Sequence, residues 1–71
     1  MERFLRYSLE KSRKIRAMLM LNGQLQQRTV TVLELTPDGA VLSIRANKPP
    51  ITVPLTDIFS CDYARGDHGE D

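Results

Sequence analysis

Five arginines near the N-terminus are the side chains of this sequence best suited to binding an anion. They are Arg3, Arg6, Arg13, Arg16 and Arg28. A guanidinium group donates two parallel hydrogen bonds to a phosphate, which suits arginine to nucleic-acid binding. Residues 1–28 carry a net charge of +5, whereas residues 29–71 carry −4. Two interpretations are open: a basic face that binds nucleic acid, and a solvated helix surface that neighbouring glutamates neutralise.

Residue types used in catalysis and metal binding are scarce. The sequence has one cysteine, Cys61, and one histidine, His68, which lies in a polar C-terminal segment. An activated nucleophile needs an adjacent base, and a zinc site needs several ligands together. We therefore expect no enzyme activity, no metal and no other cofactor. Cys61 alternates with Phe59 and Tyr63, a pattern that favours a buried and inert thiol.

Four apolar residues are candidates for an interface with another protein or a second copy of the chain. They are Met18, Met20, Ile51 and Val53. The two methionines alternate with apolar residues of a predicted strand, and methionine suits both cores and interfaces. They either contact the helix that covers the core or contact another subunit. Ile51 and Val53 belong to a short strand that we predict at a sheet edge, where a strand of another chain can add.

The elements that position these side chains begin with a predicted helix over residues 2–13. Phe4, Leu5 and Leu9 share one face of it at helical spacing. A helix of this length does not persist alone, so this face has to pack against the rest of the domain. Tyr7 lies toward the polar side, where it either packs or stacks on a base.

Five short strands are predicted after the helix. We expect them over residues 14–21, 29–33, 41–45, 51–53 and 58–63. Asn22-Gly23 is a strong signal for a two-residue hairpin turn. Leu33 and Leu35 alternate out of phase with Val30 and Val32, which predicts a bulge or a sharp bend in the second strand.

Two further segments have a composition typical of irregular structure. In Thr36-Pro37-Asp38-Gly39, we expect a turn in which proline presets one φ angle and glycine adopts a positive one. Residues 64–71 are polar and acidic, and we predict a disordered tail. Residues 1–63 are then a single domain.

These elements predict a mainly β fold, in which an N-terminal helix precedes a five-stranded, strongly bent antiparallel sheet. Curling such a sheet into a small barrel removes most of its exposed edges. The helix would cover one open end of that barrel with its apolar face.

At this level the chain resembles the small-barrel superfamily, the SH3-like and Sm-like folds, and within it the core of the WYL domain. The similar segments are Lys14-Ile15-Arg16-Ala17-Met18-Leu19, Asn22-Gly23, Arg28-Thr29-Val30-Thr31-Val32 and Val53-Pro54-Leu55-Thr56-Asp57-Ile58. The resemblance extends over residues 3–63. It implies a non-catalytic binding module assembled as a ring or a dimer.

The length and the overall charge set further limits. With 71 residues the chain is one small domain, too short for a doubly wound nucleotide-binding fold. Its net charge of +1 gives no strong general attraction to nucleic acid. No apolar run approaches the roughly 18 residues of a membrane span, and no signal-peptide stretch opens the sequence. We expect a cytoplasmic protein whose partner is a nucleic acid, another protein or a second copy, and not a membrane.

Overall fold

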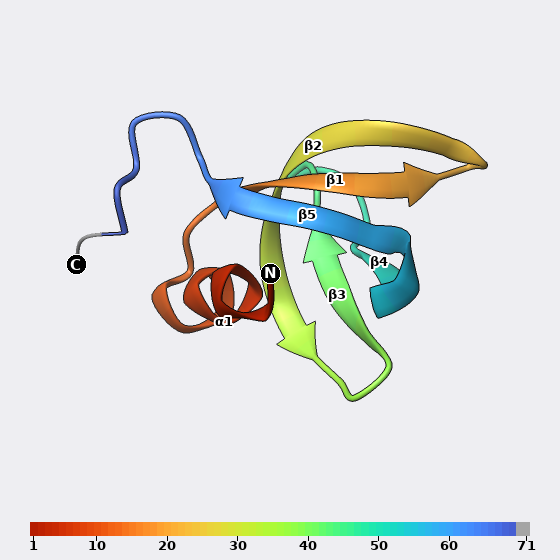
Figure 1. The fold of residues 1–71 in the computed structure, drawn as a ribbon, viewed down its shortest axis with the longest axis horizontal. Coiled ribbons are helices and arrows are strands. Elements are labelled where there is room, and N and C mark those ends of the chain that lie inside the picture. Colours follow the sequence, from red (N-terminus) through yellow and green to blue (C-terminus); the bar gives the residue numbers. More distant parts are fainter. Residues whose placement is uncertain (70–71) are drawn as a thin grey trace.

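The computed structural model describes residues 1–69, which form one helix and one five-stranded antiparallel sheet. The elements, in chain order, are α1 (Glu2–Lys11), β1 (Ile15–Leu21), β2 (Gln24–Leu35), β3 (Gly39–Ser43), β4 (Ile51–Pro54), the 3₁₀ turn η1 (Leu55–Asp57) and β5 (Ile58–Tyr63). The expectation of a mainly β fold with a leading helix is confirmed. Figure 1 shows the helix beside one end of the sheet.

The strand order in the sheet is β4-β3-β2-β1-β5. The long central strand β2 pairs with β1 over residues 24–30 and with β3 over residues 31–35, and it curves between these two partners (Figure 1). The sheet is not closed into a barrel: β4 and β5 are its two edges in the described part of the chain. Closure into a barrel, which the sequence led us to expect, is therefore not confirmed.

The bend in β2 coincides with a bulge. Val32 pairs with Leu42 and Glu34 pairs with Val41, so Leu33 is an extra residue without a partner on β3. Its side chain is 49% exposed, whereas Val30 and Val32 before the bulge are buried and Leu35 after it packs against the core. This confirms the bulge that the apolar phase shift predicts, because an inserted residue bends the strand that carries it.

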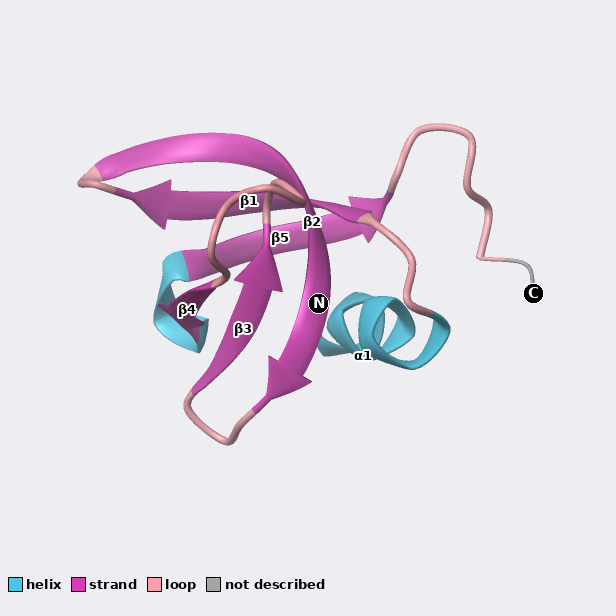
Figure 2. Cartoon of the chain, turned by 180° about the vertical axis from the view of Figure 1, so that it is seen from behind, coloured by secondary structure: helices cyan, strands magenta, loops and turns pink. Residues whose placement is uncertain are grey.

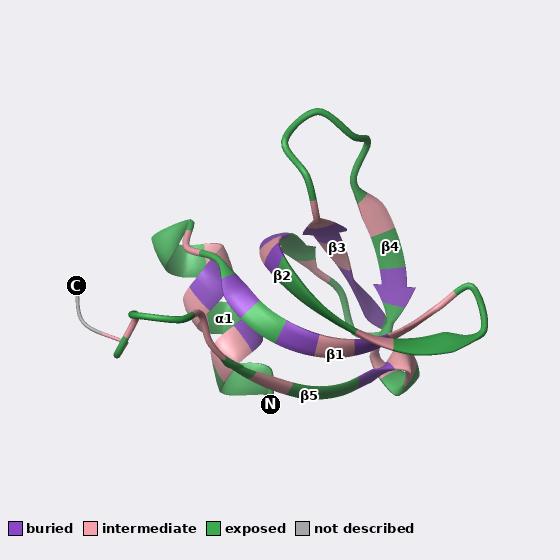
Figure 3. Cartoon of the chain, turned by 90° about the horizontal axis from the view of Figure 1, so that it is seen from above, coloured by how far each residue is buried: buried purple, intermediate pink, exposed green. Residues whose placement is uncertain are grey.

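The core lies on the concave face of the sheet. Its buried apolar side chains are Leu5, Ile15, Ala17, Leu19, Val30, Val32, Ala40, Leu42, Val53 and Ile58. From Ile15 to Leu19 of β1, buried residues alternate with exposed or half-buried ones, as Figure 3 shows, because successive side chains of a strand point to opposite faces. The hairpin between β1 and β2 turns at Asn22 and Gly23, both at positive φ, as the sequence predicts.

The helix ends at Lys11, two residues before the end that the sequence predicts. Ser12 adopts the left-handed conformation, with φ 56° and ψ 42°, and its amide hydrogen-bonds to the Ser8 carbonyl. A left-handed residue terminates a helix and redirects the chain, here toward β1 (Figure 2). Leu5 and Ser8 are the buried residues of α1.

Two predictions about β3 and β5 are wrong in detail. β3 begins at Gly39, which does not adopt a positive φ, so its role in the turn is not conformational. In β5 the register shifts at Phe59: Met18 pairs with Ser60, but Leu19 pairs with Ile58. This bulge takes Phe59 out of phase with Cys61 and leaves it 53% exposed.

Residues 64–69 belong to the segment that we expected to be disordered, and in the structure they contact the helix. The Asp67 amide hydrogen-bonds to the Ala64 carbonyl at 2.9 Å, which forms a turn. The Asp67 carboxylate then accepts hydrogen bonds from the Tyr7 hydroxyl at 2.9 and 2.7 Å. Residues 70–71 of the expected tail lie outside the described residues.

Candidate functional site

Arg3 and Arg6 occupy neighbouring positions on the exposed side of α1. The Arg3 guanidinium lies over the Phe4 ring, 4.9 Å from its centroid. Arg6 Nε is 3.5 Å from a carboxylate oxygen of Glu2, and both side chains are largely exposed. An exposed ion pair of this kind is worth about 0–1 kcal/mol. Both arginines therefore remain accessible to a ligand.

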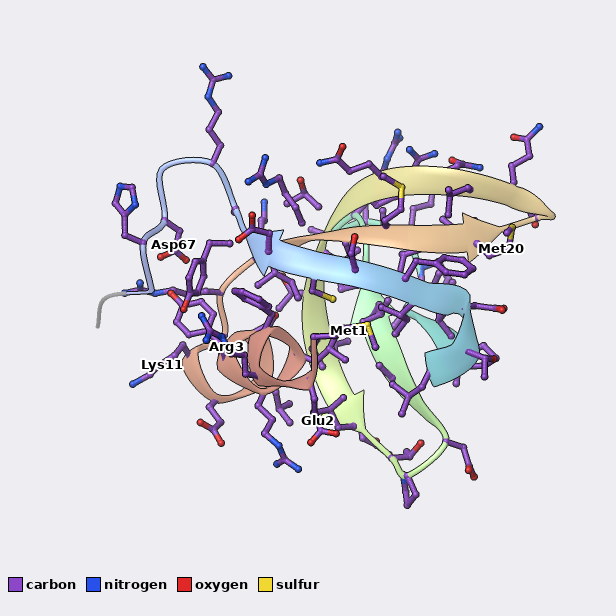
Figure 4. All side chains as sticks on the ribbon, in the orientation of Figure 1. Met1, Glu2, Arg3, Lys11, Met20 and Asp67 are labelled. Carbon is purple, nitrogen blue, oxygen red and sulfur yellow. The ribbon has the colours of Figure 1, made fainter. Side chains whose placement is uncertain are left out.

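Arg13 belongs instead to a polar cluster with Tyr7 and Asp67. Its guanidinium donates a hydrogen bond to the Tyr7 hydroxyl at 3.0 Å and lies 3.6 Å from the Asp67 carboxylate. The Gly69 amide and the Tyr7 hydroxyl donate to that carboxylate and lower the pKa of Asp67, and the nearby Arg13 charge lowers it further. Asp67 is thus ionised at neutral pH and neutralises Arg13. Figure 4 shows Asp67 on the C-terminal segment beside the helix.

Arg16 and Arg28 lie on opposite faces of the β1–β2 hairpin. Arg16 Nε donates to the Tyr63 carbonyl at 2.9 Å, and its guanidinium lies 3.6 Å from the Asp62 carboxylate. Arg28 pairs with buried Ala17 in the register, so it points to the face opposite Arg16. It donates hydrogen bonds to the Gln27 carbonyl and the Gln26 side chain. The structure therefore does not gather the five arginines into one basic face.

The aromatic side chains near the helix pack against one another. The Phe4 and Tyr63 ring centroids are 4.9 Å apart, those of Tyr7 and Tyr63 are 5.1 Å apart, and both pairs are edge-to-face. Burial raises the pKa of the Tyr7 hydroxyl, and the hydrogen bond to Asp67 raises it as well. Of the two alternatives for Tyr7, packing is the one that the structure shows.

Met18 and Met20 lie on the convex face of the sheet, away from the core. Both are half-buried, and neither is among the side chains that pack against the core cluster. Met20 pairs with Leu25, which is 56% exposed, at the end of the hairpin far from the helix (Figure 4). The alternative in which the helix covers these methionines is wrong. Contact with another subunit stays a prediction.

At the edge strand β4 the backbone is available to a partner, whereas the side chains of Ile51 and Val53 pack toward the core. Val53 pairs with Ala40 and is only 3% exposed, because its side chain belongs to the core. Ile51 is half-buried and also packs against the core. The edge position of β4 is confirmed, but the Val53 side chain is not available to a partner.

Cys61 is half-buried on β5, and burial raises the pKa of its thiol. The thiol is therefore protonated at neutral pH and a poor nucleophile. Within residues 1–69, no three side chains of the metal-ligating types lie close enough together to hold a metal ion. No helix in the same range is long and apolar enough to cross a membrane.

The charge distribution in the sequence does not predict a groove that the structure places near the start of β1 and the end of β3. Its lining includes two cations, Lys14 and Arg45, and the hydroxyl side chains of Thr29, Thr31 and Ser43. Because these residues come from three separate segments, only the strand register brings them together. The sequence by itself shows the two positive charges, but not that three hydroxyl side chains lie beside them.

Comparison of the chain with protein-family models, with curated proteins and with solved structures finds no significant match.

Proposed function

We propose that this chain is a non-catalytic binding module of the small-barrel kind that associates with a second copy of itself through the edges of its sheet. The supporting observation is that β4 and β5 are both edge strands in the described part of the chain. An edge strand presents backbone N–H and C=O groups that a strand of another subunit can pair with. The resemblance to small barrels, which implies a ring or a dimer, points the same way.

Apolar surface beside an edge strengthens this proposal. Phe59, in the bulge of β5, is 53% exposed, and a phenylalanine side chain gains about 1.5–3 kcal/mol when it is fully buried. A domain of this size buries only about 60% of its unfolded surface. Pairing at an edge would bury both the ring and unpaired backbone groups, so association would stabilise the domain.

Phe59→Lys should shift the protein toward monomer, with an increase of about tenfold or more in the dissociation constant. The change removes apolar contact area and places a charge at the strand edge. Light-scattering mass across a concentration series measures the effect. The matched control is Leu25→Lys, which makes the same kind of change on the central strand β2 at an equally exposed position.

The two variants separate the possible outcomes. Dissociation by Phe59→Lys alone supports association at the β5 edge. Dissociation by Leu25→Lys alone would move the interface to the convex face near Met20. A wild-type protein that stays monomeric at every concentration contradicts the proposal.

A second candidate function is contact with nucleic acid through the helix. The observation that favours it is the accessibility of Arg3 and Arg6, which lie three residues apart on α1 and therefore on the same side. Arg13 and Arg16 add little to such a surface, since Asp67 and Asp62 neutralise them.

Replacing Arg3 and Arg6 together by alanine should weaken binding of single-stranded nucleic acid and flatten its salt dependence. Each phosphate neutralised on a single strand contributes about 0.7 to the log–log slope, so losing two contacts should reduce the slope by about 1.4. Fluorescence anisotropy at several salt concentrations measures both quantities. Arg28→Ala with Arg65→Ala removes the same charge elsewhere, and an equal effect there would rule out a helix-specific contact.

A further inference from the structure

The groove beside Lys14 and Arg45 has the composition of an anion site. Its volume is about 460 Å³, within the range of roughly 300–1,000 Å³ usual for small-ligand sites. The complete lining is Lys14, Thr29, Thr31, Ser43, Ile44, Arg45, Ala46 and Asn47. This lining contains no carboxylate, whereas two other grooves of the described chain contain Glu2 and Asp62 respectively.

The strand register directs three hydroxyl groups toward this groove. Thr31 and Ser43 are cross-strand partners on β2 and β3, and Thr29 lies two residues earlier on β2. Residues i and i+2 of a strand share a face, and Val30 and Val32 between them point into the core. The three hydroxyls therefore form a row on the convex face. Each can donate one hydrogen bond to an anionic oxygen.

The two cations of the groove have no acidic partner among residues 1–69. Ion pairs engage Arg6, Arg13 and Arg16, but within the described part of the chain no ion pair or side-chain hydrogen bond involves Lys14 or Arg45. Arg16 lies beside the groove, opposite Thr29 in the register, and pairs with Asp62 across β1. Glu34 pairs with Val41, two residues before Ser43 on β3, but it does not line the groove. The lining itself carries two positive charges and no negative one.

We propose that this groove binds a phosphate group carried by a nucleotide, either free or in a single-stranded nucleic acid. Lys14 supplies a mobile point charge and Arg45 a planar pair of donors, and the hydroxyls complete the hydrogen bonding of the phosphate oxygens. Ile44 and Ala46 line the same groove and provide apolar contact for the sugar or base. The site is separate from the sheet edges and from the helix arginines.

The test is an NMR titration of the ¹⁵N-labelled full chain with AMP, with adenosine and with an oligothymidylate of ten nucleotides. Phosphate binding should shift the amide signals of Thr31, Ser43 and Arg45 with AMP or the oligonucleotide, and not with adenosine. Shifts with AMP identify a free nucleotide as a sufficient source, while shifts with the oligonucleotide alone identify the nucleic-acid backbone. Absence of shifts at these residues with both phosphate probes overturns the proposal, as does an equal response to adenosine.

Lys14→Ala with Arg45→Ala should weaken binding of the active probe by about tenfold or more, because both charge-assisted contacts are lost. Both side chains are exposed, so the fold should persist. Thr31→Val, which removes only the hydroxyl at nearly constant shape, should weaken binding by a smaller factor. Arg28→Ala with Arg65→Ala is the matched control, because it removes the same charge at exposed positions outside the groove. If Arg3→Ala with Arg6→Ala lowers affinity in the groove assay and the Lys14–Arg45 pair does not, the helix binds the phosphate and the groove proposal fails.

Discussion

Ser8→Ala should destabilise the domain by about 2–4 kcal/mol, although it removes only one oxygen atom. Ser8 is completely buried between α1 and β2. Its hydroxyl donates to the Arg13 carbonyl at 2.6 Å and accepts from the Val32 amide at 2.9 Å. Alanine would remove both hydrogen bonds and leave the buried Val32 amide without this partner. Leaving a buried polar group unsatisfied costs about 1–3 kcal/mol.

Urea unfolding at one fixed protein concentration measures this loss, with the concentration held constant because association would change the apparent stability. Ser60→Ala is the matched control, since Ser60 is exposed on β5 and its hydroxyl makes no hydrogen bond within residues 1–69. The control should stay within about 0.5 kcal/mol of the wild type. If Ser8→Ala behaves like the control, Ser8 does not link the helix to the sheet.

The Ser8 link shows the kind of information that local sequence patterns lack. At helical spacing Ser8 is only a small residue between Leu5 and Leu9, and nothing near it in the sequence indicates a partner at Val32. The partner is 24 residues away, at the bulge of β2. The bulge itself could be predicted, because an inserted residue changes the phase of apolar residues within one strand. The same holds for the hairpin at Asn22-Gly23, whose residue types favour positive φ.

The ion pairs could not be predicted either, because their partners are also far apart in the sequence. Tyr7 and Asp67 are 60 residues apart, and Arg16 and Tyr63 are 47 apart. Composition indicates a basic N-terminal part and an acidic C-terminal part. The fold brings the two parts together, so Arg13 and Arg16 are neutralised by acidic residues of the second part. The cations that remain for ligand binding are those that the acidic second part does not neutralise, and identifying them requires the register of the strands.

Gly39→Ala should destabilise the domain by about 1–3 kcal/mol, the usual cost of excess volume in a packed site. A Cβ at this position would lie 2.7 Å from the Val53 carbonyl oxygen and 3.3 Å from its carbon. Both are backbone atoms, so relief requires β4 to move away from β3. Glycine is therefore needed here for close approach and not for a positive φ. Urea unfolding measures the loss, and a change within about 0.5 kcal/mol would contradict the argument.

The comparison variant Gly66→Ala distinguishes the two reasons for which a position requires glycine, namely close approach of another backbone and a positive φ. Gly66 has φ +85°, and a Cβ added there would have nothing within 4 Å, so alanine suffers backbone strain alone. It should cost about 1–2 kcal/mol and leave amide exchange in β4 unchanged. Gly39→Ala should instead accelerate exchange at the Val53 amide and at Leu55, which donates to the Asp38 carbonyl at 2.9 Å. Because β4 is an edge strand, displacing it should also weaken any association that uses this edge, whereas Gly66→Ala should leave association intact.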